Sequence, residues 1–249
     1  MTLEGKVVLV TRARDRAGEL SERLRARGAI ALEAPAIRIE PVPEGGRLDE
    51  AIRDTAMRGH FWVAFTSAAG VEAWFDRARV LGYEARDLNA RVAAVGRGTA
   101  ESLLAHGARA DLVPPTFTTE ALGEVFPEGG GTVLLPRADI APEELEEALT
   151  AKGWEPVPVD AYRSIPERSM PPEASEALAG GRVDAITFTS ASTVAGFVQM
   201  AGVVRGPVVV CIGPVTARGA AAAGLEVAGV ADPHTLDGLA DAVERALSG

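Results

Sequence analysis

Residues 61–71 read FWVAFTSAAGV, and residues 184–194 repeat the pattern as DAITFTSASTV. The Phe-Thr-Ser triplet that begins at Phe65 returns 123 residues later, at Phe188. In both stretches an apolar run stops at Thr-Ser and continues into small residues, which is typical of a strand that leads into a helix. Two copies of this strand–helix unit predict a protein made of two similar halves.

Other units recur in the same order along the chain. Residues 8–13 (VLVTRA) correspond to 133–138 (VLLPRA), and residues 96–100 (GRGTA) correspond to 213–217 (GPVTA). Matches that keep both order and near-constant spacing indicate an internal duplication. The repeated strands are short aliphatic runs, which favours parallel sheets covered by helices on both faces. The predicted fold class is α/β, with two similar three-layer, parallel-sheet domains joined by a two-stranded linker.

Proline-bracketed extended segments follow the first unit of each half, at residues 35–43 (PAIRIEPVP) and 156–166 (PVPVDAYRSIP). Such segments suit connectors between two bodies, so we expect the chain to cross between its domains twice. A contiguous split near Glu128 is the alternative. The predicted division is a discontinuous domain at 1–34 plus 168–249, a second domain at 42–157, and connector strands at 35–41 and 158–167.

Composition excludes several classes of protein. A single Cys and three His without metal-binding spacing predict neither an internal disulfide nor a zinc site. The net charge of −10 argues against a nucleic-acid-binding protein, which would present a basic face. The first residues form neither a signal peptide nor a membrane span, so we expect a cytoplasmic protein without a membrane partner. A monomer is the default expectation.

The carboxyl ends of the predicted strands carry the candidate binding residues. Ligands of parallel α/β folds bind at that edge, where helix N-termini offer N–H groups and nearby hydroxyls add donors for carboxylate or phosphate. The alternative is that Thr and Ser, Thr99 among them, only cap helices, and that Gly only forms turns. The candidate substrate-binding residues are Thr11, Arg12, Arg14, Thr66, Ser67, Ala68, Gly96, Arg97, Thr99, Arg137, Ala138, Thr189, Ser190, Ala191, Ser192, Gly213, Pro214 and Thr216.

Tyr162 is the candidate catalytic residue. It lies in the second connector beside Arg163, where a phenol could donate a proton or a hydrogen bond to a leaving group. The alternative is a packed aromatic ring that stiffens the connector. Tyr83, in a loop that ends a helix, has no comparable role.

Taken together, these motifs resemble the uroporphyrinogen-III synthase family. Each motif is loose by itself, but their order and spacing are specific and extend through nearly the whole chain. The segments that carry the resemblance are 8–12 (VLVTR), 65–71 (FTSAAGV), 93–100 (AAVGRGTA), 134–139 (LLPRAD), 159–164 (VDAYRS), 184–194 (DAITFTSASTV) and 211–217 (CIGPVTA).

The resemblance implies two α/β domains with the active site between them and a reaction that needs no cofactor. In that reaction the linear tetrapyrrole hydroxymethylbilane loses its hydroxyl, and the ring closes with inversion of ring D through an azafulvene and a spiro intermediate. The resemblance further implies that Tyr162 donates the proton to the departing hydroxyl. It makes hydroxymethylbilane the expected small-molecule partner, handed over by hydroxymethylbilane synthase.

Two other functions stay open at this point. A two-lobed tetrapyrrole- or anion-binding regulatory protein would share the fold and the ligand contacts without turnover. A nucleotide-dependent transferase is disfavoured, because the glycine pattern at Gly96 is an incomplete dinucleotide fingerprint.

Overall fold

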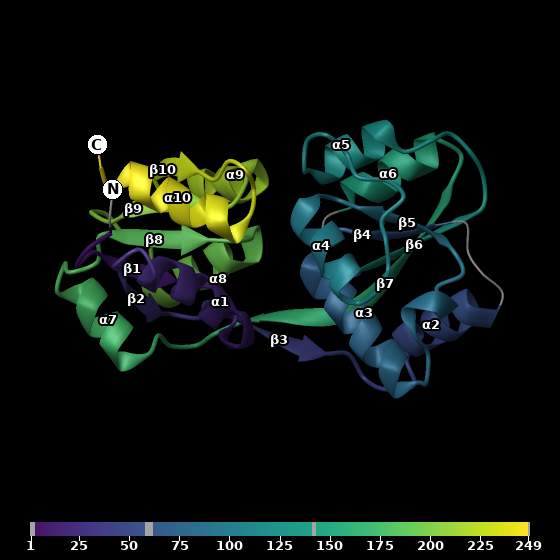
Figure 1. Cartoon of the computed structure of the whole chain (residues 1–249), viewed down its shortest axis with the longest axis horizontal. Helices are drawn as coiled ribbons and strands as arrows, with labels where there is room; N and C mark the ends of the chain where they lie inside the picture. The colour runs from purple at the N-terminus through teal and green to yellow at the C-terminus, as the bar shows by residue number, and fades with distance from the viewer. Residues whose placement is uncertain (1–2, 58–61, 141–142, 249) are drawn as a thin grey trace. The chain divides into compact units, whose positions relative to one another are not determined.

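The computed structural model describes residues 3–57, 62–140 and 143–248, so Phe61 of the first Phe-Thr-Ser stretch lies outside the described residues. The chain divides into two compact units, each associated with a five-stranded sheet (Figure 1). Unit 1 comprises Met1–Ile39 and Ser164–Gly249, and unit 2 comprises Glu40–Arg163. The predicted α/β fold class with two parallel-rich sheets is confirmed.

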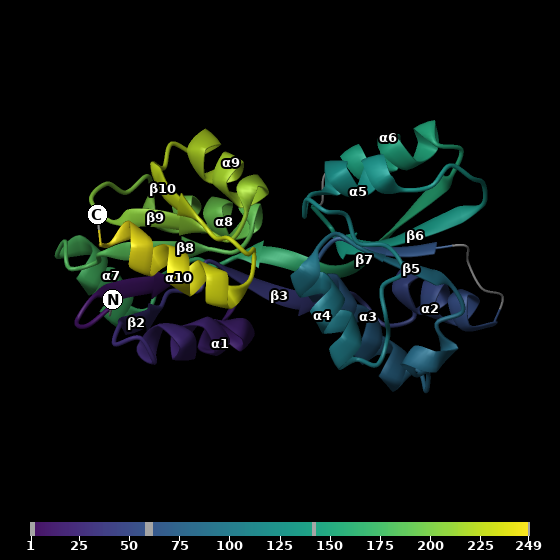
Figure 2. The same ribbon diagram turned by 45° about the horizontal axis from the view of Figure 1, so that its top comes forward.

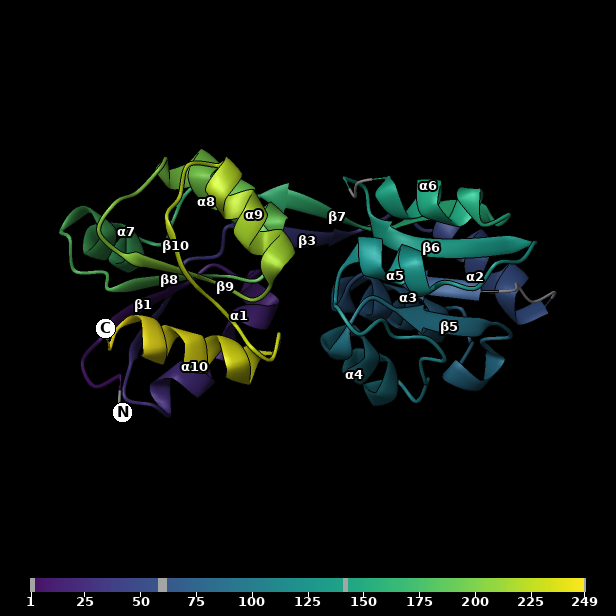
Figure 3. The same cartoon turned by 90° about the horizontal axis from the view of Figure 1, so that it is seen from above.

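The sheet of unit 1 has the order β10-β9-β8-β1-β2, and all of its neighbouring strands are parallel. Helices α1 and α10 cover one face, and α7, α8 and α9 cover the other (Figure 3). The strands are β1 (Val7–Val10), β2 (Ile30–Glu33), β8 (Ala185–Phe188), β9 (Val208–Cys211) and β10 (Val227–Val230). The helices are α1 (Arg14–Arg25), α7 (Pro172–Ala179), α8 (Ala191–Ala201), α9 (Pro214–Ala222) and α10 (Leu236–Ala246).

The second sheet has the order β3-β7-β6-β4-β5. Helices α5 and α6 cover one face, and α2, α3 and α4 lie on the other (Figure 2). The strands are β3 (Ile37–Pro41), β4 (Trp62–Phe65), β5 (Arg91–Ala94), β6 (Thr132–Ala138) and β7 (Glu155–Pro166). The helices are α2 (Arg47–Met57), α3 (Ala68–Val80), α4 (Arg97–Ala105), α5 (Thr119–Val125), α6 (Glu144–Ala151) and the short 3₁₀ turn η1 (Ala85–Asp87). The boundary between the units crosses both β3 and β7.

The repeated apolar runs fold as their patterns predict. Every residue of β4 and β8 is buried, which fits runs that are apolar except at Thr187, whose hydroxyl donates to the Leu9 carbonyl at 3.0 Å. Phe65 packs edge-on against Trp74 of α3, and Phe188 packs edge-on against Phe197 of α8. Each run therefore anchors its strand to the helix that directly follows it.

The strand order reverses at an equivalent place in both sheets. In unit 1, β2 extends the sheet outward from β1, while β9 and β10 extend it from β8, so the reversal falls between β1 and β8. In unit 2 the reversal falls between β6 and β4. Ligands of open α/β sheets bind outside the carboxyl ends of the strands at such a reversal. The two Phe-Thr-Ser triplets end β4 and β8, which places both of them at this position.

Candidate active site

The serine of each Phe-Thr-Ser triplet caps the helix that follows. Ser67 Oγ accepts a hydrogen bond of 3.0 Å from the Gly70 N–H, and Ser190 Oγ accepts one of 3.1 Å from the Thr193 N–H. A Cβ on Gly70 would lie 2.8 Å from the Pro136 carbonyl oxygen, so this first turn of α3 packs directly on the end of β6. Both serines therefore cap their helices, and in unit 2 the cap also places the start of α3 at the strand reversal.

Tyr162 lies beside Ser67 in unit 2. The Ser67 Oγ and Tyr162 Oη atoms are 3.2 Å apart and share a hydrogen bond in which either atom could be the donor. Tyr162 is 8% exposed, and its carbonyl accepts the Asp139 N–H at 3.2 Å. Tyr162 is therefore held by hydrogen bonds through both its backbone carbonyl and its side-chain hydroxyl.

A β-bulge in β7 directs the Tyr162 side chain. Arg137 of β6 is in register with Asp160, but the next residue, Ala138, is in register with Tyr162, which leaves Ala161 as the extra residue. Ala161 and Tyr162 are both buried, so the alternation of the strand shifts by one residue at this point. Bulges re-aim side chains in this way and occur often next to active sites.

Sequence reasoning proposed Tyr162 as a candidate but missed the bulge beside it. The sequence places it in a connector, whereas in the structure it pairs with β6 as part of the sheet. The sequence does carry a signal for the bulge. Val159 and Ala161 are two residues apart, as expected for one face of a strand, and Tyr162 is a second apolar residue directly after Ala161. Two successive apolar residues in an alternating strand indicate a bulge.

The arginines at the equivalent ends of β1 and β6 both pair with glutamates on the helix that follows. Arg12 Nη1 lies 3.3 Å from Glu19 Oε2 on α1, and Arg137 forms an ion pair with Glu146 on α6. An anionic ligand would have to share these guanidinium groups with the glutamates. Arg14 and Arg97 are instead exposed in the first turns of α1 and α4.

The glycines of the GRGTA and GPVTA motifs are the N-caps of α4 and α9. A Cβ on Gly96 would lie 2.7 Å from the Phe117 Cβ, whereas one on Gly213 would lie 3.8 Å from the His234 ring. The expectation that Thr99 caps its helix is wrong, because α4 begins at Arg97 and Thr99 is buried inside the first turn. Phe117 closes over the cap position and leaves room only for glycine.

The remaining candidates lie at the carboxyl ends of their strands, though Thr11 faces inward. Thr11 is fully buried, and its hydroxyl donates to the Thr187 carbonyl at 2.7 Å, which ties β1 to β8. The candidates gathered at this edge in unit 1 are Thr11, Arg12, Arg14, Thr189, Ser190, Ala191, Ser192, Gly213, Pro214 and Thr216. Those of unit 2 are Thr66, Ser67, Ala68, Gly96, Arg97, Thr99, Arg137, Ala138 and Tyr162.

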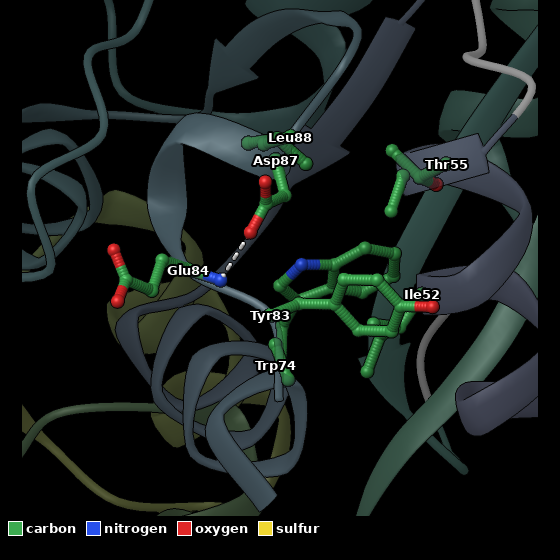
Figure 4. Close-up of a pocket in the computed structure, with 9 residues that line it drawn as sticks. Ile52, Thr55, Trp74, Tyr83, Glu84, Asp87 and Leu88 are labelled. Carbon is green, nitrogen blue, oxygen red and sulfur yellow. Dashed lines mark hydrogen bonds between the residues drawn. The ribbon is translucent and has the colours of Figure 1, made fainter. Parts of the chain in front are cut away.

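Two hollows in the described residues lie away from these strand ends. A cavity of about 10 Å³, room for about one water molecule, lies between α2, α3 and η1 (Figure 4). Tyr83 lines it beside Trp74, so this tyrosine sits apart from the candidate site. A larger hollow of about 490 Å³ lies where β8 and β9 begin, lined by residues that include Leu178, Arg205 and Leu247.

The described residues contain neither a metal-binding cluster nor a membrane-spanning helix. No three His, Cys, Asp or Glu side chains among them are grouped so as to hold a metal ion. Within the same residues, no helix combines the length and the apolar character needed to cross a membrane.

Comparison with known proteins gives one consistent result. The family model described as uroporphyrinogen-III synthase HemD matches residues 18–241. A uroporphyrinogen-III synthase from Synechococcus elongatus is 35% identical over 255 residues, covering 98% of this chain and 96% of that protein.

Solved structures share the fold. A mutant uroporphyrinogen III synthase from Thermus thermophilus superposes with a TM-score of 0.69 at 24% identity, covering 98% of this chain and 99% of that one. A uroporphyrinogen-III synthetase from Helicobacter pylori gives a TM-score of 0.60 at 18% identity, covering 98% and 99%. With the family model and the sequence relative above, these results show that the chain belongs to the uroporphyrinogen-III synthase family, hydro-lyases of tetrapyrrole biosynthesis.

Proposed function

We propose that Tyr162 is the proton donor when this chain converts hydroxymethylbilane, the substrate that the family implies, into uroporphyrinogen III. One observation carries the proposal. The Tyr162 phenol is held beside the strand reversal of unit 2 by a β-bulge and by a hydrogen bond to Ser67. A general acid must be held within hydrogen-bonding reach of the atom that it protonates, and both features restrict where the hydroxyl can point.

The proposed chemistry begins at the hydroxymethyl group. The phenol of Tyr162 gives its proton to the departing hydroxyl as the C–O bond breaks, so that water leaves. The pyrrole nitrogen lone pair supplies the electrons that form the electrophilic azafulvene. The substituted carbon of ring D then attacks to give the spiro intermediate, and rearrangement followed by loss of a proton yields the inverted ring D. Orientation of the substrate supplies much of the rate, because well-placed reacting groups gain large effective concentrations.

Backbone amides at the helix starts are the proposed carboxylate binders. The first turn of a helix has N–H groups without intrahelical partners, and the positive end of the helix dipole favours anions there. Exposed Arg14 and Arg97 lie in such first turns and add positive charge. This mode of binding suits an acidic protein, because it needs few cationic side chains.

The decisive experiment compares Tyr162→Phe with Tyr83→Phe. Each variant is incubated with freshly made hydroxymethylbilane, and the amounts of uroporphyrinogen isomers I and III are measured after separation. We expect Tyr162→Phe to form isomer III at least about 100-fold more slowly, the lower range for loss of a general acid, so that isomer I from spontaneous closure dominates. Tyr83→Phe should behave as the parent. Near-normal turnover to isomer III by Tyr162→Phe would refute the proposed role.

Four further expectations belong with this proposal. We propose a cytoplasmic monomer that works without a cofactor and receives its substrate from hydroxymethylbilane synthase. Light scattering behind a sizing column tests the monomer, with a mass near 25.9 kDa as the expected result. A hand-over would appear as faster isomer III formation in a coupled reaction than from the same concentration of free substrate.

A further inference from the structure

We propose that Ser67 is a positioning residue that acts through Tyr162, and that it donates its hydroxyl hydrogen to the phenol oxygen rather than to the substrate. The inference deepens the proposed function and rests on the role given there to Tyr162. It reassigns Ser67, which the sequence suggests as a substrate ligand. The hydrogen bond of 3.2 Å between Ser67 Oγ and Tyr162 Oη is the starting observation.

The role proposed for Tyr162 requires one direction for this bond, and the hydrogen-bonding capacity of Ser67 allows it. A serine hydroxyl has one hydrogen to donate and two lone pairs to accept with. One lone pair already receives the Gly70 N–H at 3.0 Å. If the single Ser67 hydrogen goes to Tyr162 Oη, the phenol keeps its own hydrogen for the leaving hydroxyl. The reverse direction would direct the phenol proton to Ser67 and leave none for catalysis.

The same arrangement stabilises the anion that proton donation creates. Once Tyr162 has lost its proton, the phenolate oxygen receives the Ser67 hydrogen, and Ser67 Oγ is itself polarised by the Gly70 N–H at the start of α3. Hydrogen bonds in a chain strengthen one another, and a helix N-terminus favours negative charge. Because Tyr162 is buried, water contributes little to this stabilisation, and the protein has to supply it.

The other half of the duplication shows that the contact is not an automatic result of capping. Ser190 occupies the same cap position in unit 1, yet its hydroxyl lies 2.9 Å from Ser192 Oγ and within reach of the Thr193 hydroxyl. A capping serine therefore satisfies its hydrogen bonds within its own helix when no phenol is beside it. Of these two capping serines, only Ser67 shares a hydrogen bond with a phenol.

A double-mutant cycle tests the inference. Ser67→Ala removes the hydroxyl and the cap, whereas Ser67→Gly removes the hydroxyl but places at the cap a residue that helix N-termini tolerate well. In the parent protein we expect either change to lower kcat for isomer III about fivefold with little change in KM, the effect of one hydrogen bond. In the Tyr162→Phe background the same changes should have no further effect, because the residue through which Ser67 acts is gone. Equal losses in both backgrounds would overturn the inference and make Ser67 a substrate ligand.

A spectroscopic readout keeps the test independent of turnover. The chain has two tyrosines, so the Tyr83→Phe variant leaves Tyr162 as the only phenol to follow by ¹³Cζ NMR or by its absorbance on ionisation. In this background Ser67→Ala and Ser67→Gly should raise the ionisation midpoint by about 0.5–1 pH unit, and Ser67→Thr should restore it. Ser190→Ala, the matched loss of a cap, should leave the midpoint unchanged.

The two readouts separate the possible failures. An unchanged midpoint in both the Ser67→Ala and Ser67→Gly variants would overturn the inference whatever Tyr162 does in catalysis. A raised midpoint together with a fully active Tyr162→Phe variant would keep the hydrogen bond but refute the proposed role of the phenol. Thermal unfolding of each variant confirms that the comparison is made on folded protein.

Discussion

The serine that caps α3 in unit 2 shares a hydrogen bond with a phenol, whereas the serine that caps α8 in unit 1 bonds to hydroxyls of its own helix. The difference originates in the strand segments that follow the first unit of each half. Ala36-Ile37-Arg38 corresponds to Ala161-Tyr162-Arg163 at a spacing of 125 residues, the same spacing that relates Arg12 to Arg137. The counterpart of Tyr162 is thus Ile37, which is buried and has no polar group.

The two positions also differ in how closely a helix approaches them. A Cβ on Gly196 of α8 would lie 3.0 Å from Ile37 Cγ2, so α8 packs tightly against this isoleucine. In unit 2 the bulge at Ala161 brings Tyr162 to the cap of α3 instead. Duplication supplied two equivalent strand reversals, and one of them carries the phenol of Tyr162 while the other has the apolar packing of Ile37.

Exchanging the two counterparts should have the largest effect. Tyr162→Ile removes the proposed acid, and we expect isomer III formation to fall by about 10²–10⁴-fold. Adding Ile37→Tyr should not restore activity, because the new ring would have to fit against α8, which packs tightly on this position. Rates and isomer ratios measured for the single and the double variant test both expectations. Recovery in the double variant would show that the two halves are interchangeable.

The two buried phenylalanines of the triplets should matter about equally for stability. Phe65 and Phe188 are both fully buried against aromatic rings of the helix that follows. Phe65→Ala and Phe188→Ala should each lower the free energy of unfolding by about 3–5 kcal/mol in urea denaturation. Val80→Ala, at an exposed site, should change it by less than about 0.5 kcal/mol. A loss under about 1 kcal/mol for either phenylalanine would contradict equivalent construction of the two halves.

Acid should weaken unit 2 more than unit 1. Asp49 is buried, and its bidentate bond to Arg77 holds the pKa of the carboxyl below its usual value, against the effect of burial. At Asp184 burial raises the pKa, but the Val7 N–H and Lys6 together hold it below its usual value. Both carboxylates therefore stabilise the fold above pH of about 4, and this stability is lost as the pH falls through the lowered pKa of the folded state.

The matched variants are Asp49→Asn and Asp184→Asn. Removing the buried partner of Arg77 should cost about 3 kcal/mol at pH 7, whereas Asp184→Asn should cost about 1 kcal/mol or less, because its pair with Lys6 is partly exposed. Urea denaturation between pH 7 and pH 2 measures both costs. The Asp49→Asn variant should also lose less stability on acidification than the parent, and an unchanged pH dependence would contradict the assignment.

The smallest effect is expected at the two cap glycines. Gly96→Ala and Gly213→Ala lose the same kind of cap, so their difference isolates the crowding by Phe117. We expect Gly213→Ala to cost well under 1 kcal/mol, and Gly96→Ala to cost about 1 kcal/mol more, because the new Cβ would meet the Phe117 Cβ. Thermal unfolding of the pair measures this difference. Equal melting temperatures would show that Phe117 moves aside freely.

Local patterns in the sequence were sufficient for most of the fold. The spacing of Ala17, Leu20, Ser21 and Leu24 marks the buried face of α1, and the structure buries these four residues. The largely apolar runs before each Thr-Ser identify buried strands, because a strand covered on both faces admits polar side chains only where they are hydrogen-bonded, as Thr187 is to the Leu9 carbonyl. Thr99 was assigned wrongly as a cap, since α4 begins two residues before it and has Gly96 as its N-cap.

The sequence by itself determined that this protein is a duplicated α/β chain, which residues end its strands, and which tyrosine is the candidate acid. The duplication and the strand ends follow from periodicity and repetition, which act between residues close in the chain or at a constant spacing, whereas Tyr162 was suggested by its place in the second connector and by the family resemblance. Only the tertiary structure decided that Tyr162 forms a hydrogen bond with Ser67, that Arg12 and Arg137 form ion pairs with glutamates, and that Thr11 faces inward. Contacts of this kind depend on strand order and on a one-residue bulge, which a pattern of apolar residues does not specify.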